Sequence, residues 1–133
     1  MSVKAGQAQD LAIRLGAEDT RALRAEKQRV YSECRGSIDD LFVAADQLRN
    51  RTTGAVDLAS ALGAMYRATA AVKLIAPGPL GDLANTTARA MAETATANAA
   101  VLDADNKVYN NRQSLYRLMR EDLSVDERAG SAS

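Results

Sequence analysis

The sequence predicts an all-α protein: an antiparallel helical bundle of three long helices plus a short N-terminal helix, with coiled-coil-like packing. Apolar residues recur at alternating steps of four and three along most of the chain, as on the buried face of a bundle helix. Two prolines and eight glycines interrupt 133 residues, which leaves long runs that favour helix. A chain of this length forms one domain.

The first eighteen residues predict a short helix of their own. Leu11 and Leu15 lie four residues apart and therefore share a helical face, and Gly16 follows as a stop signal. We expect residues 1–18 to form a separate N-terminal segment.

A long helix is predicted over residues 19–50. Asp19 or Thr20 supplies a side-chain oxygen that caps its first turn. Gly36 lies inside this helix at a cost of ~1 kcal/mol relative to alanine, without ending it. The apolar stripe follows steps of four and three: Leu23, Lys27, Val30, Cys34, Ser37, Leu41, Ala44 and Leu48.

A second helix is predicted over residues 55–76, after a polar connector at 49–54. Thr53 is its expected cap, and Asp57 suits the positive end of its dipole. Three charged side chains interrupt its apolar run, so we expect a buried bundle helix and no membrane span. Its stripe is Leu58, Leu62, Met65, Thr69, Val72 and Ile75 or Ala76.

The segment "APGP" predicts a tight corner between the second and third helices. Pro77 biases the preceding residue away from helical geometry, and Gly78 supplies a flexible joint. Pro79 fits the first turn of a helix, where its missing N–H has no cost, and Asp82 suits the same turn.

The third helix is predicted as one continuous element over residues 80–122, since no proline or glycine occurs between Asp82 and Gly130. Residues 123–133 are polar and predicted to form a flexible tail. The stripe of the third helix is Leu83, Thr87, Ala90, Thr94, Ala97, Val101, Ala104, Val108, Asn111, Leu115 and Leu118.

The three predicted lengths, roughly 45, 30 and 60 Å at about 1.5 Å per residue, do not match. The second half of the third helix therefore outruns its neighbour. The N-terminal segment folds against it, a bend near residues 103–106 turns it back, or a second chain covers it. We favour the second chain, and expect a homo-oligomer or a helical protein partner. The side chains to be covered are Leu102, Val108, Leu115, Tyr116, Leu118 and Met119.

The chain offers little for catalysis. It has no histidine, which excludes Ser-His-Asp and Cys-His mechanisms and imidazole-based metal sites. Cys34 lies on the apolar stripe and is expected to be a core residue. No glycine-rich phosphate loop occurs, and Asp103, Asp105 and Asn106 lack the glycine and glutamate of a calcium loop. We expect a non-catalytic protein without metal or cofactor that acts through protein–protein contact.

Charge and cysteine usage give the remaining expectations. Seventeen basic residues balance seventeen acidic ones, so nucleic acid is a weak candidate partner. One unpaired cysteine and no signal peptide favour the cytoplasm. Small-molecule binding between the second and third helices is a further candidate. The alternative function, nucleic-acid-associated regulation, uses the basic strip of residues 14–35: Arg14, Arg21, Arg24, Lys27, Arg29 and Arg35.

Three stretches carry a family resemblance. They are "QRVYSECRGSIDDL", "AAVKLIAPGPLGDLA" and "RQSLYRLMREDLSV". In this order, across residues 28–125, they resemble a diffuse group of short actinobacterial helical-bundle proteins of unknown function. The resemblance implies helical architecture rather than an activity. Some members of that group carry an N-terminal membrane helix, whereas this sequence has none.

Overall fold

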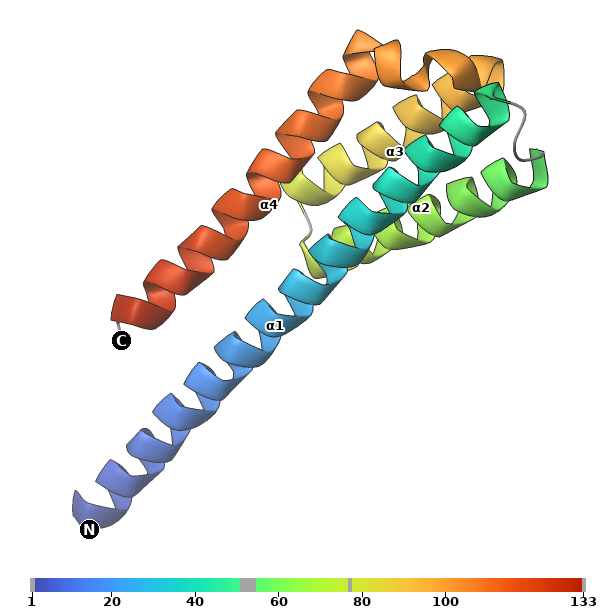
Figure 1. Ribbon diagram of the computed structural model, residues 1–133. Helices are drawn as coiled ribbons and strands as arrows, with labels where there is room; N and C mark the ends of the chain where they lie inside the picture. Colours follow the sequence, from blue (N-terminus) through green and yellow to red (C-terminus); the bar gives the residue numbers. More distant parts are fainter. Residues whose placement is uncertain (1, 51–54, 77, 133) are drawn as a thin grey trace.

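The computed structural model describes residues 2–50, 55–76 and 78–132, and the side-chain surroundings of residues 18–48, 50, 57–76, 78–99 and 101–124. Every regular element in this part of the chain is helical, which confirms the all-α prediction. The elements are α1 (Ser2–Arg49), α2 (Ala55–Ile75), α3 (Pro79–Asn98), a 3₁₀ segment η1 (Ala99–Ala104) and α4 (Asn106–Ala132) (Figure 1).

The first helix is continuous from Ser2 to Arg49, so the predicted break near Gly16 is wrong. A glycine inside a helix costs only about 1 kcal/mol, and good helix formers on both sides offset that cost. Asp19 and Thr20 are consequently interior residues of α1 and not its caps. The predicted flexible tail is also helical, since α4 continues to Ala132.

The corner between α2 and α3 has the predicted form. Pro79 is the first residue of α3 and Asp82 lies in its first turn. Gly78 precedes it with φ of 99°, a left-handed backbone that glycine adopts without steric cost. The Asp82 N–H donates to the Gly78 carbonyl at 2.9 Å and closes the first turn. Thr53 and Pro77, the expected cap and stop of α2, lie outside the described residues.

The predicted single helix over residues 80–122 is wrong, because η1 divides it into α3 and α4. Asp105 precedes α4 and caps it: its Oδ1 accepts a hydrogen bond from the Val108 N–H at 2.9 Å. A carboxylate in this position satisfies a backbone donor that the first helical turn leaves free and suits the helix dipole. The structure therefore has the bend near residues 103–106 that the sequence left as one of three alternatives.

The bend returns α4 alongside α1. The Tyr31 hydroxyl donates to Asp122 Oδ2 at 2.6 Å, and the Arg112 guanidinium lies 4.3 Å from the centre of the Phe42 ring. Residue numbers thus rise along α1 while they fall along the facing part of α4. Figure 1 shows α4 leaving η1 and running back in the same general direction as α1.

The core lies where these four helices meet. Alanine is the commonest buried residue that α3 contributes to this core, and its small side chain lets neighbouring helix backbones approach closely. Two buried threonines satisfy their hydroxyls within their own helices, Thr69 by donating to the Met65 carbonyl at 3.0 Å and Thr87 to the Leu83 carbonyl at 2.7 Å. The largest fully buried side chains are Ile38, Leu41, Met65, Met91, Leu102, Leu115, Val72 and Val108.

The N-terminal part of α1 extends past the other helices (Figure 1). The six residues from Glu18 to Leu23 are exposed, and Leu23 keeps 47% of its surface accessible. Counting from Glu18, where the description of side-chain surroundings begins, the first deeply buried residue of α1 is Lys27. Among the described helices, none has an apolar stretch long enough to cross a bilayer.

Candidate interaction surface on α1

The six residues predicted to contact a partner are covered by the chain itself. Leu102 and Leu115 are 1% and 0% exposed, and Val108 and Met119 are equally buried. Tyr116 and Leu118 are half-buried against the same core. A second chain was expected to cover these side chains, whereas in the structure the bend at η1 folds α4 onto α1 and α3 and the chain covers them itself. Their apolar surface is accounted for without a second chain.

A charged pair joins α4 to α1 near the end of the bundle. Lys27 Nζ lies 3.2 Å from Asp122 Oδ2, and Tyr31 donates to the same carboxylate. The Lys27 side chain is 11% exposed and that of Asp122 is 30% exposed. A lysine this deeply buried needs a carboxylate partner, so this network positions α4 on α1.

Aromatic and guanidinium groups continue the seam between α1 and α4. The Arg35 guanidinium lies 4.7 Å from the centre of the Tyr116 ring. Burial, followed by the nearby Asp39 carboxylate, raises the pKa of Tyr116 to about 12. The Tyr116 hydroxyl is buried without a hydrogen-bond partner in the described part of the chain. The seam therefore holds the tyrosine neutral and offers it no acid–base partner.

Cys34 lies within the core at 0% exposure, as expected from its place on the apolar stripe. Burial raises the pKa of its thiol from 9.0 to about 11. The thiolate is the reactive form of cysteine, and burial disfavours it. This environment suits a packing role.

The buried thiol predicts a loss of stability at alkaline pH. The folded protein retains the Cys34 proton, with a pKa of about 11, to a higher pH than the unfolded chain, with a pKa near 9.0. Stability therefore falls as the pH rises from 9.0 through about 11, by about 3 kcal/mol from this group. Urea unfolding at several pH values measures it. A Cys34→Ala variant should show a shallower alkaline decline, and an unchanged decline would contradict the assignment.

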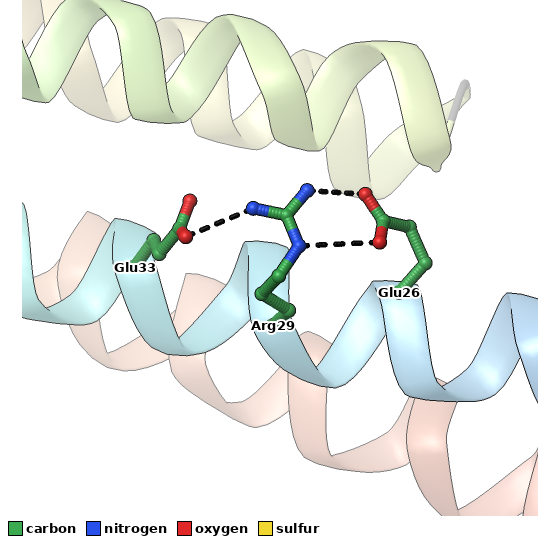
Figure 2. A network of polar contacts seen from close by, with 3 residues as sticks. All are labelled: Glu26, Arg29 and Glu33. Carbon is green, nitrogen blue, oxygen red and sulfur yellow. Dashed lines mark hydrogen bonds and ion pairs between the residues drawn. The ribbon is translucent and has the colours of Figure 1, made fainter.

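Arg29 is neutralised on the surface of α1 (Figure 2). Its Nε donates to Glu26 Oε2 at 3.1 Å, its Nη2 pairs with Glu26 Oε1, and its Nη1 donates to Glu33 Oε1 at 2.9 Å. The two glutamates lie three residues before and four residues after the arginine, where helix geometry brings side chains together. The group carries a net charge of −1.

The predicted basic strip does not form one face. Lys27 is buried and paired, Arg35 stacks on an aromatic ring, and Arg24 is half-buried. Arg21 is exposed, whereas the surroundings of the Arg14 side chain lie outside the described residues. Arg29 is paired with Glu26 and Glu33, and the accessible Arg21 and Arg35 lie among exposed acidic residues of the same helix, so the charge distribution does not favour nucleic-acid binding.

A second stripe with the four-three spacing runs along the exposed side of α1. We name it the α1 outer stripe. Every member is exposed, and Val43 keeps 54% of its surface accessible. Most members other than the charged ones have small side chains. The stripe consists of Glu18, Ala22, Ala25, Arg29, Ser32, Gly36, Asp39 and Val43.

Grooves border the α1 outer stripe on both sides. The groove beside α4 has a volume of about 530 Å³, and Arg35 and Arg120 lie along it. The groove beside α2 has a volume of about 410 Å³, and Glu33 and Asp40 lie along it. Gly36 lines both grooves, so the stripe forms the ridge between them. The neighbouring helices thus leave this side of α1 open.

Packing within the described part of the chain does not require a glycine at position 36. A Cβ atom added there would meet nothing within 4 Å, whereas one added at Gly81 would lie 2.6 Å from the Ala76 carbonyl oxygen. Alanine would stabilise a helix interior by about 1 kcal/mol at Gly36, and the described contacts do not offset that difference. A glycine on an exposed ridge permits another backbone to approach closely.

Comparison with protein-family models, curated proteins and solved structures finds no match to this chain. The α1 outer stripe was missed by the sequence reasoning because it carries few large apolar residues. The sequence feature that could have indicated it is a second set of positions with the four-three spacing, on a different face of α1 from the buried stripe.

Proposed function

We propose that this protein is a non-catalytic, antiparallel helical bundle with coiled-coil-like packing that acts by helix-mediated contact with another protein. The contact surface is the α1 outer stripe together with the N-terminal extension of α1, which is the part of this helix that projects past the other helices (Figure 1). The observation that carries the proposal is that α1 continues past the bundle while the stripe stays exposed along its length.

The extension needs a partner to be a stable helix. An isolated helix in water is only marginally stable, and proteins stabilise helices chiefly by packing one face against a neighbouring element. Within this chain no described helix covers residues 18–23. A second helix laid along the stripe supplies that neighbour.

The stripe suits close helix contact. Ala22, Ala25, Ser32 and Gly36 present little side-chain bulk, so a partner backbone approaches nearer than it would over leucine or lysine. Val43 ends the stripe with an exposed apolar side chain that loses water on contact. These features suit recognition of a helix better than turnover of a small molecule.

Site-specific photocrosslinking in the native cells tests the proposal. A benzophenone amino acid placed at Ser32, on the stripe, should give a discrete adduct with one protein, whether another copy of this chain or a different one. The same group placed at Arg89, exposed on α3, is the matched control. Equal labelling from both positions, or no adduct from Ser32, would contradict the proposed contact surface.

A further inference from the structure

We propose that the partner is a second copy of this chain, in a parallel, two-fold dimer whose α1 outer stripes pack against each other. This inference rests on the proposed function and names its partner. It is carried by the charges that flank the stripe, by the small residues along it and by the extension of α1.

The two edges of the stripe carry opposite charges. On one side lies a basic edge at intervals of seven residues, in which one of the four members is uncharged: Arg14, Arg21, Gln28 and Arg35. On the other lies an acidic edge at the same interval: Asp19, Glu26, Glu33 and Asp40. Each member from residue 19 onward is exposed. These are the positions that flank the contact seam of a coiled coil and set the orientation of its helices.

Parallel pairing brings the unlike edges together. In a parallel pair each basic-edge residue faces the acidic-edge residue five positions later on the other helix. An antiparallel pair instead places basic edge on basic edge and acidic edge on acidic edge, which is repulsive. The attractive parallel pairs are Arg14 with Asp19 of the partner subunit, Arg21 with Glu26 of the partner subunit, and Arg35 with Asp40 of the partner subunit.

The stripe itself tolerates this arrangement. In a parallel two-fold pair each residue meets its own counterpart, so Gly36 meets Gly36 of the partner subunit and the backbones approach without a Cβ between them. Arg29 enters the seam already neutralised by Glu26 and Glu33 (Figure 2). The contact between the two Gly36 backbones in the dimer would then offset the helix stability that glycine loses relative to alanine.

The two acidic residues of the stripe are flanked by cations on the same helix. Arg14 and Arg21 lie four residues before and three residues after Glu18, and Arg35 lies four residues before Asp39. These spacings place unlike charges next to each other on a helix surface. Unlike charges at these spacings on the same helix reduce the repulsion between like residues of the two subunits.

The N-terminal extensions lie side by side in a parallel dimer. The sequence continues the four-three spacing of the stripe toward the N-terminus through Leu15, Leu11 and Ala8. Each extension thereby becomes a neighbour of the other. A parallel orientation therefore covers the part of α1 that Figure 1 shows projecting alone.

A charge swap between the edges tests partner and orientation together. Arg14→Glu and Asp19→Arg should each turn two attractive pairs per dimer into repulsive ones and raise the dimer dissociation constant about tenfold, as measured by sedimentation equilibrium. The double variant should return close to the value of the unchanged protein. Residues five apart do not face each other on one helix, so this rescue arises only between subunits.

A disulfide test reports orientation independently. Ser32→Cys should form a linked dimer under mild oxidation, since parallel pairing sets the two cysteines opposite each other within disulfide reach. Arg89→Cys, exposed away from the stripe, is the control and should stay unlinked. Cys34 can remain, because it is buried in the core.

The outcomes separate this inference from the proposed function. A protein that sediments as a monomer at all concentrations overturns the dimer, whereas a Ser32 photoadduct with a different protein would still support contact through the stripe. A dimer without charge-swap rescue, or one that leaves Ser32→Cys unlinked, overturns the parallel arrangement. Rescue together with the Ser32 disulfide supports it.

Discussion

Replacement of Gly81 by alanine is expected to lower the free energy of unfolding by about 2 kcal/mol. Gly81 is buried in the first turn of α3, next to the end of α2. An added Cβ atom would lie 2.6 Å from the Ala76 carbonyl oxygen and 3.0 Å from the Lys73 Cα. Both are backbone atoms, so the methyl group fits only if the corner between α2 and α3 opens. This strain exceeds the gain of about 1 kcal/mol that alanine brings to a helix.

Gly63→Ala is the matched control for this prediction. Gly63 also lies inside a helix, and its added Cβ would meet only the Arg67 Nη1 at 3.5 Å, an ordinary contact with a flexible side chain. The control should therefore stabilise the protein by up to about 1 kcal/mol. Urea unfolding of both variants measures the difference. Equal effects at the two positions would show that the close approach at the corner is absent.

The same corner shows which features a sequence can predict. Proline fixes its own φ and lacks an N–H, and glycine tolerates a positive φ, so "APGP" limits the local backbone whatever surrounds it. The C-terminal end of α2 and the start of α3 followed from these local rules within a residue or two. The all-α class followed from the apolar spacing for a similar reason, since a long periodic pattern is compatible with one kind of element.

The continuity of α1 and the division of the third predicted helix depended on smaller differences in free energy between local conformations. Gly16 and Asp105 each shift the local preference by about 1 kcal/mol, which packing elsewhere easily overrides. The sequence therefore predicted a break at Gly16 that is absent, and left open the bend near residues 103–106 that is present. The bend decides which side chains of α4 are buried.

The candidate surface was misplaced for a related reason. Large apolar residues in η1 and α4 were expected to face a partner, yet Leu102 and Leu115 lie in the core. The α1 outer stripe passes unnoticed in a search for apolar periodicity because Ala22, Ser32 and Gly36 contribute little hydrophobic area. Its exposure depends on where α2 and α4 pack around α1, which tertiary structure alone decides.

Leu115→Ala is expected to lower the free energy of unfolding by about 3 kcal/mol, the second large effect. The Leu115 side chain is 0% exposed and belongs to the core shared by α4 with the other helices. Truncation removes buried methyl groups and leaves a cavity that rigid neighbours fill only in part. The measurement is urea unfolding monitored by circular dichroism.

Leu74→Ala is the control, because Leu74 is 85% exposed and its truncation should change stability by less than about 0.5 kcal/mol. Repeating both measurements at low and high protein concentration separates burial within one chain from burial by a partner. If α4 packs on its own chain, the loss caused by Leu115→Ala is the same at both concentrations. A loss that appears only at high concentration would mean that a second chain covers α4. The contact surface would then consist of the residues that the sequence analysis predicted.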